Sequence, residues 1–359
     1  MNYWVKYWAC RSFAVLLMAS ALLSVFYSSA SMAQESLFTY LVKQGFKQGG
    51  LLLRAKPVSD VIDDNTVNPR TKKFLRLSQD VLSFAHNDLG MKTGKSYRKY
   101  IQLDRAWVTQ IVVAAQKSSM EPYLFTYPIM GKLPYKGFFD EADAIELEEA
   151  LKKQNLDTYR RPVEAFSTTG WLPDPILSTM LGSEARFIEL LCHELTHATF
   201  YFKEEADFNE AFASWMGFRG AIQFVEQHKS SLENPDQLLK DLNDDHIWQL
   251  RFAKVIKEVL DYAKDFYAHQ ANVAHKDFAW REELFQWIKN RFAREKGMER
   301  FANQSWNNAY LNGLGTYYLL VEPIDSYAKA HQLSPAQLLK KVTESGPSII
   351  AEINNAKSK

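Results

Sequence analysis

The segment RFIELLCHELTHATFYF, residues 186–202, places three titratable side chains on one turn of an otherwise apolar run. His193 and His197 are four residues apart, so on a helix their imidazoles lie on one face and can bind the same ion. Burying such groups without partners costs about 2–7 kcal/mol for each neutral polar group and more for a charge. Two histidines and a carboxylate form a ligand set that suits zinc. The pattern therefore predicts a metal-binding helix.

Glu194 stands next to the first histidine and points about 100° away from it around a helix, so it is poorly placed to bind the same ion. It can instead take a proton from water at the metal. This arrangement is the His-Glu-x-x-His signature of zinc hydrolases, in which the glutamate is the general base. The competing interpretation is a pair of buried core histidines whose spacing is fortuitous.

A third ligand is expected from the stretch DFNEAFAS, which follows the histidines after a short turn. Glu210 lies one turn into the next predicted helix, residues 207–228, and its carboxylate can reach back to the ion. Two histidines and one glutamate leave a fourth position for water, which is the catalytic arrangement. Asp207 is the alternative ligand, although aspartate is common at a helix start for helical reasons alone.

The N-terminal 33 residues have the features of a secretory signal. A charged start precedes the apolar run FAVLLMASALLSVFY, residues 13–27, and small residues precede Gln34. We therefore expect a signal peptide at 1–33, cleavage after Ala33 and a periplasmic protein. The alternative is an uncleaved anchor in the inner membrane, for which this run is short against about 30 Å of hydrocarbon.

Composition narrows the class of protein. The chain has 359 residues, of which 47% are hydrophobic and 24% charged, as in soluble globular proteins. A net charge of +1 gives no indication of a nucleic-acid partner. Cys10 falls in the signal, so Cys192 would be alone in the mature chain and no internal disulfide can form. Cys192 is expected to be a buried, unreactive thiol.

Stretches rich in β-branched and aromatic residues predict strands only in the first half of the chain. The middle stretch contains a Gly131-Lys132 break, which indicates a hairpin. Helical spacing precedes the strands in 36–62 and 70–91, and nearly everything from residue 184 onward is helical. The three predicted strand regions are 107–116, 123–139 and 159–170.

The fold class is therefore α+β and predominantly helical, with a small mixed sheet over the helix of His193. We expect a catalytic core at 34–230 and a helical C-terminal subdomain, 231–359, packed on it. A sheet stacked over a metal-bearing helix leaves a groove in which an extended peptide can pair with an edge strand. The hairpin at 123–139 offers such an edge.

Several blocks in order resemble a known family and run from about Tyr40 to Tyr317. They are QGGLLLRAKPVSDVI, FAHNDLGMKTGKSYRKYIQLDR, YPIMGKLPYKGFFD, EAFSTTGWLPDPILSTML, CHELTHATFYFKEEADFNEAFAS and NNAYLNGLGTY. The chain is similar in them to the predicted aminopeptidases of Gram-negative bacteria, a zincin-like group of zinc peptidases. The resemblance implies a zincin-like metalloprotease core, zinc bound by His193, His197 and Glu210, and Glu194 as general base.

Two positions depart from related patterns. Many members of the family carry a lipid-attachment cysteine at the signal boundary, and this chain has none there. Thermolysin-like enzymes place an acidic residue four positions after the ligand glutamate to orient a histidine, whereas Ser214 occupies that position here. Asp207 is the candidate that could take over this orienting role.

The expected reaction is hydrolysis of a peptide substrate by zinc-activated water, with Glu194 passing the proton to the leaving amine. Two other functions suit the same motif. One is a non-peptidase zinc amide hydrolase of the cell envelope, and the other is a non-catalytic binding protein with a structural zinc. Structural sites usually close with a fourth protein ligand, and Cys192 points to another side of the helix.

Two further roles have several candidate residues. An aminopeptidase needs an acidic group for the substrate's α-ammonium, and the stretch before the histidines offers Glu121, Asp140, Glu164 and Asp174. The sequence does not decide between exopeptidase and endopeptidase.

A hydroxyl that stabilises the oxyanion is expected on a later helix, in NNAYLNGLGTYYLL. Tyr310 and Tyr317 are seven residues apart and share a helix face, whereas Tyr318 points away. Tyr317 is the candidate catalytic residue, because the family-like block ends on it. The alternative is that Tyr310 and Tyr317 are core aromatics at helical spacing.

Overall fold

A computed structural model describes residues 40, 43–44, 49–127, 131–164, 173–271, 273, 277–318 and 321–355, the last four of 277–318 by backbone only. The predicted signal at 1–33 lies outside the described residues. By its contacts the chain divides into two units, Met1–Ser36 and Leu37–Lys359, and every described residue belongs to the second. The predicted boundary between 230 and 231 stays a prediction. No helix in the described part of the chain is long and apolar enough to cross a membrane.

The strands of the described residues form three small sheets. One has the order β1-β2-β8, with β1 and β2 antiparallel and β2 and β8 parallel. The second is antiparallel with the order β6-β3-β7, and the third is the β4-β5 hairpin. The strands are β1 (Lys56–Pro57), β2 (Lys99–Ile101), β3 (Thr109–Ala115), β4 (Phe125–Tyr127), β5 (Gly131–Leu133), β6 (Tyr135–Phe138), β7 (Asp157–Val163) and β8 (Ile176–Leu177).

The prediction of one mixed sheet was wrong, because the strands divide among three separate sheets. Pro134 separates β5 from β6 and has no amide N–H to donate, so the chain changes its pairing partner there. The hairpin expected at 123–139 is present as β4-β5. A Cβ added at Gly131 would lie 2.7 Å from Glu204 Cγ, so the hairpin packs against the segment that joins α6 to α7.

Helices make up most of the described chain, and the α+β, mainly helical class is confirmed. The helix expected over 36–62 is interrupted, since Lys56–Pro57 is strand β1. The helices are α3 (Val58–Asp63), α4 (Pro69–Asn87), α5 (Glu141–Lys153), α6 (Glu184–Thr199), α7 (Ala206–Gln227), α8 (Pro235–Gln270), α9 (Glu282–Ala293), α10 (Glu299–Ala302), α11 (Asn308–Tyr318), α12 (Val321–Ala330), α13 (Pro335–Ser345) and α14 (Ile349–Asn355).

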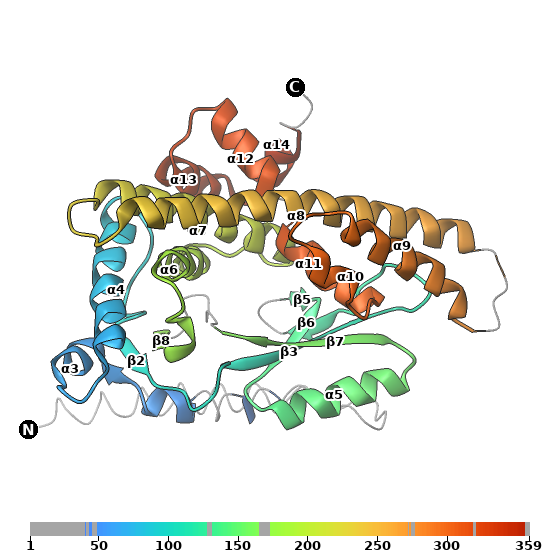
Figure 1. Ribbon diagram of the computed structural model, residues 1–359, viewed down its shortest axis with the longest axis horizontal. Helices are drawn as coiled ribbons and strands as arrows, with labels where there is room; N and C mark the ends of the chain where they lie inside the picture. The colour runs from blue at the N-terminus through green and yellow to red at the C-terminus, as the bar shows by residue number, and fades with distance from the viewer. Residues whose placement is uncertain are drawn as a thin grey trace, which may run out of the picture. The chain divides into compact units, whose positions relative to one another are not determined.

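The β6-β3-β7 sheet has α5 on one face and α11 on the other (Figure 1). Helices α6 and α7 pack closely on each other, and the long helix α8 contacts both of them. The largest hydrophobic cluster surrounds α6 and α7 and extends from Leu51 to Ile353. The helix with the histidines is therefore part of the main core, where it contacts α4, α7 and α8.

Candidate metal centre and its cleft

Helix α6 carries His193 and His197 because local signals fix its start and its buried side. The Ser183 side chain caps the first turn by accepting from the backbone N–H of Arg186 at 3.2 Å. Phe187, Leu191 and other apolar residues fill the buried side. With that side fixed, the two histidines face α7 at the final turns of the helix.

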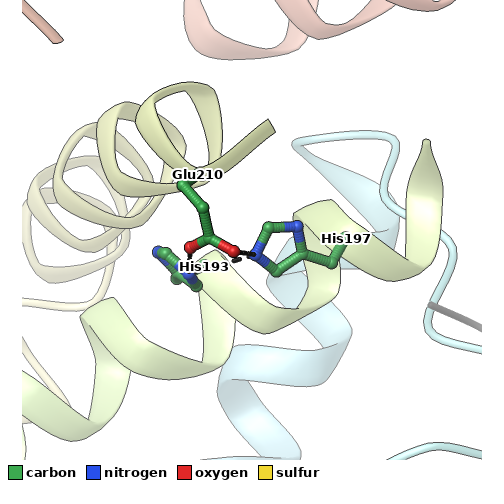
Figure 2. A group of neighbouring side chains, drawn as sticks. All are labelled: His193, His197 and Glu210. Carbon is green, nitrogen blue, oxygen red and sulfur yellow. Dashed lines mark hydrogen bonds and ion pairs between the residues drawn. The ribbon is translucent and has the colours of Figure 1, made fainter. Parts of the chain in front are cut away.

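The structure brings His193, His197 and Glu210 together (Figure 2). Their ligand atoms all lie within 4.8 Å of one another. The two histidine Nε2 atoms are 3.2 Å apart. Glu210 Oε2 lies 3.6 Å from His193 Nε2, and its Oε1 lies 3.7 Å from His197 Nε2. Asp207 is exposed in the first turn of α7 and is not in this group.

These separations suit a cation better than direct hydrogen bonds. A distance of 3.6 Å is too long for an N–H···O hydrogen bond. Ligands at about 2.0–2.2 Å from a tetrahedral zinc ion would be separated by about 3.4 Å. The side chains of His193, His197 and Glu210 are only 19%, 10% and 15% exposed. The three residues could hold such an ion, and they leave room for water or substrate as a further ligand.

Two features of α7 place Glu210 opposite the histidines. The buried Asn209 side chain accepts from the N–H of Phe202 at 3.0 Å and donates to its carbonyl at 2.7 Å, which ties the α6–α7 connection to the first turn of α7. Gly217 lets the helices approach, because a Cβ there would lie 2.9 Å from the carbonyl oxygen of Glu189 and 3.3 Å from His193 Cβ. Both features were missed in the sequence analysis.

The ionisable side chains at the site shift one another's pKa. Burial raises the pKa of the Glu194 carboxyl, and the nearby Glu210 adds to the shift while both histidines oppose it. Burial opposes ionisation of Glu210, but His197 and His193 outweigh it and hold the pKa of that carboxyl well below its usual range. Burial likewise opposes charge on His197, yet the Glu210 carboxylate raises the pKa of that imidazole. Glu194, at 7% exposure, thus lies beside the candidate ligands.

Two buried tyrosine hydroxyls near this group have no hydrogen-bond partner among the described residues, those of Tyr97 and Tyr201. Tyr97 has a φ of 58°, a conformation that bulky side chains rarely adopt. Burial and the Glu194 carboxylate raise the pKa of Tyr97, and burial and the Glu210 carboxylate raise that of Tyr201. Neither was predicted, because a tyrosine in a loop has no sequence signal for such a position.

A cleft of about 400 Å³ opens beside His193. Strand β7 and helices α6, α7, α8, α10 and α11 line it, and Ser214 and Glu189 lie in its wall. The cleft size is within the range of about 300–1,000 Å³ that is usual for ligand sites. Its lining is Tyr159, Arg161, Arg186, Glu189, Leu190, His193, Ser214, Trp248, Gln249, Phe252, Arg300, Phe301, Tyr310, Gly313 and Leu314.

Of the two tyrosine candidates on α11, Tyr310 has a described side chain. Tyr310 is 6% exposed, lines the cleft, and packs its ring on Tyr159 and Trp306 at 4.4 and 4.9 Å between centroids. The side chain of Tyr317 lies outside the described residues, so its role stays a prediction.

The acidic residues proposed for the substrate amine are elsewhere. Glu121 is exposed, Asp140 caps α5, and Glu164 is half exposed and pairs with Arg186. Asp174 is 2% exposed and lies near Tyr97. None of the four lines the cleft beside His193.

Comparison with known proteins identifies the family. A family model described as "Putative aminopeptidase" matches residues 39–344. The chain belongs to this family. No curated protein and no solved structure matches it. The match confirms the resemblance of the sequence blocks to aminopeptidases and suggests that the protein is a peptidase. The three residues of the candidate metal centre lie inside the matched range.

Proposed function

We propose that the protein is an exported, zinc-dependent peptidase with a zincin-like core. His193, His197 and Glu210 hold the metal, and Glu194 is the general base. The observation that carries the proposal is the convergence of three ligand atoms within 4.8 Å beside the buried Glu194. Membership of the aminopeptidase family supports hydrolysis of peptides over other uses of the same ligand set.

The chemistry divides between the ion and the chain. When bound, zinc lowers the pKa of water to about 7 and polarises the scissile carbonyl. Glu194 accepts the proton of the attacking water and delivers it to the departing amine. The cleft beside His193 has room for the peptide.

Oxyanion stabilisation has two candidates. Tyr317 remains the candidate from the sequence. Among the described side chains, Tyr201 is the structural candidate, because its buried hydroxyl lies near Glu210 with no partner in the described part of the chain. A hydroxyl in that state is available to donate to a substrate oxygen.

The test is Glu194→Gln in the zinc-loaded protein. The amide keeps the size of the side chain but cannot accept the proton, so zinc content and fold should be retained while kcat falls by about 10² or more. Glu184→Gln on the same helix is the matched control, since Glu184 lies in the first turn and pairs with Lys73. Full activity of Glu194→Gln contradicts the proposal.

A substrate panel separates the peptidase from its rival. The zinc-loaded protein should cleave members of a peptide library and leave non-peptide amides of cell-envelope type intact. The reverse preference would make it an amide hydrolase of another class, and no turnover of either would favour a binding protein.

Export is part of the proposal and rests on residues 1–33. Mass spectrometry of the periplasmic fraction should find a mature N-terminus near Gln34. An intact Met1 in the membrane fraction would show an uncleaved anchor instead.

A further inference from the structure

Glu189 is an acidic side chain in the cleft with no catalytic role assigned above. It lies one helical turn before His193 on α6 and lines the cleft together with it. Gln249 of α8 hydrogen-bonds to its carboxylate, and its charged neighbours are His193, Asp245 and Arg186. Among the described residues no cation lies within 4.0 Å of it, the distance of an ion pair.

Glu189 packs closely against α7 and also lines the cleft. Glu189 packs against Gly217 of α7, where a Cβ would lie 3.3 Å from Glu189 Cγ. Ser214, one turn earlier on α7, is the neighbouring small residue in the cleft wall. A larger residue at either position would narrow the space between the carboxylate and His193.

The spacing along α6 suits the amino terminus of a peptide. In a peptide the α-nitrogen lies about 2.5 Å from the carbonyl carbon of the same residue. A charge-assisted hydrogen bond adds about 2.8 Å, so the acid that holds the amine should lie about 5 Å from the scissile carbon. Glu189 and His193 are four residues apart, which is about 6 Å along an α-helix, close to this value.

The remaining cleft wall is largely aromatic. Tyr159, Trp248, Phe252, Phe301 and Tyr310 line it. Such a surface favours a large apolar or aromatic side chain over a small or charged one.

Three arginines line the cleft, and two of them, Arg186 and Arg300, are exposed, whereas Arg161 of β7 is half buried. Arg186 is 65% exposed at its side chain and binds Glu164 at 3.4 Å. Arg300 is exposed and stacks on Phe301, with its guanidinium carbon 4.7 Å from the ring centroid. Among the described residues that line the cleft, Glu189 is the acidic one, and His193 lies next to it on α6.

We propose that Glu189 binds the α-ammonium of the substrate and that the aromatic wall receives the first side chain. The site then selects peptides with a free amino terminus and a large apolar first residue. This inference rests on the peptidase function proposed above, and it makes the protein an exopeptidase.

The kinetic test compares Phe-Ala-Ala amide with its N-acetylated form. Wild-type protein should cleave the unblocked peptide with a kcat/KM at least about 10²-fold higher. Glu189→Gln should lower kcat/KM for the unblocked peptide by about 10²-fold and leave kcat/KM for the acetylated peptide unchanged. The ratio of the two kcat/KM values should therefore fall towards one. Glu164→Gln, the paired acid outside the cleft, should keep the wild-type ratio. An unchanged ratio in Glu189→Gln, with normal zinc content, overturns the assignment.

A binding test is independent of turnover. Calorimetry with phenylalaninamide on the metal-free protein should show binding that Glu189→Gln reduces at least about tenfold, whereas N-acetylphenylalaninamide should not discriminate the two proteins. Equal affinity of both proteins for phenylalaninamide overturns the inference. If wild-type protein binds the amine through Glu189 but cleaves no peptide, the peptidase proposal fails while the amine site stands.

Discussion

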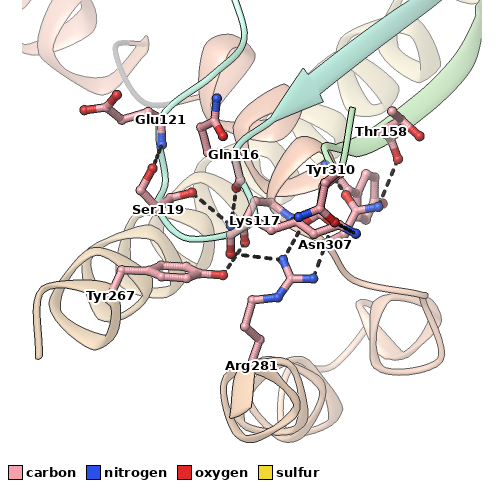
Figure 3. Close-up of polar contacts among 12 residues, drawn as sticks. Gln116, Lys117, Ser119, Glu121, Thr158, Tyr267, Arg281, Asn307 and Tyr310 are labelled. Carbon is pink, nitrogen blue, oxygen red and sulfur yellow. Dashed lines mark hydrogen bonds and ion pairs between the residues drawn. The ribbon is translucent and has the colours of Figure 1, made fainter. Parts of the chain in front are cut away.

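The protein has two buried polar clusters that differ in how their side chains are paired. In the first the side chains hydrogen-bond to one another, and in the second they are held at longer distances. The first lies between β7, α8, the turn before α9 and the start of α11 (Figure 3). Arg281 donates to both oxygens of Asp157, at 2.6 and 3.3 Å, and the backbone N–H of Asn308 donates to one of them at 3.0 Å. The Asn308 amide donates to the carbonyls of Gln116 and Ser119, and its oxygen accepts from Tyr267 at 2.8 Å.

In this first cluster donors and acceptors match almost completely. Only Arg281 Nε has no acceptor among the described residues. The cluster joins the start of β7 to the start of α11, and α11 carries Tyr310, which lines the cleft. Its role is therefore to fix the position of an element.

The second cluster, His193, His197 and Glu210, brings acceptors together instead. The two imidazole Nε2 atoms are 3.2 Å apart, and each lies 3.6 or 3.7 Å from an oxygen of Glu210. The buried hydroxyls of Tyr97 and Tyr201, which have no partner among the described residues, lie nearby. Buried polar groups are almost always paired, and the proposed zinc ion would bind all three residues of this cluster at once.

The largest expected effect is on the structural cluster. Arg281→Met leaves the buried Asp157 carboxylate without its cation and should lower the free energy of unfolding by about 3–5 kcal/mol. Lys73→Met, which breaks the ion pairs of the 38% exposed Lys73 with Glu184 and Glu233, should cost about 1 kcal/mol or less. Chemical denaturation measures both. A similar small loss in the two variants would remove the distinction between the clusters.

The next effect is expected from two tyrosines with opposite roles. Tyr201→Phe should lower kcat by about 10² with little change in KM or stability, because its hydroxyl has no described partner to lose. Tyr267→Phe should keep kcat but lose about 1 kcal/mol of stability, since it breaks the bond to Asn308. Tyr317→Phe tests the sequence candidate alongside. If Tyr201→Phe is as active as wild type, Tyr201 is not the oxyanion donor.

The smallest effect concerns the helix spacing under the metal ligands. Gly217→Ala must shift α6 against α7, because its Cβ would lie 2.9 Å from a backbone oxygen, and the shift moves Glu210 relative to the histidines. Zinc affinity should fall about tenfold, as measured by competition with a chelator. Gly313→Ala is the control, since the closest atom to its Cβ is 3.8 Å away. Equal zinc affinity in both variants would show that the close approach does not position Glu210.

What the sequence predicted was local. Helical spacing places His193, Glu194 and His197 on one turn, and Glu210 was predicted because it follows after a short connection. The helical class and the β4-β5 hairpin also follow from patterns within short windows. Local spacing is sufficient where the partners are close along the chain.

What the sequence did not predict depends on contacts between distant segments. Asp157 and Arg281 are 124 residues apart, and no pattern near either one indicates their pairing. Gly217 and Glu189 matter only because α6 and α7 pack at that point. The division of strands among three sheets likewise depends on long-range pairing, such as β2 with β8. Each of these needed the folded arrangement.

The central claim is that His193, His197 and Glu210 bind one zinc ion. Elemental analysis of the purified mature protein measures this directly, with His193→Ala, His197→Ala, Glu210→Ala and the control Asp207→Ala prepared in parallel. We predict one zinc per chain in wild type and in Asp207→Ala, none in either histidine variant, and much weaker binding in Glu210→Ala. Full zinc retention in His193→Ala or His197→Ala would contradict the account.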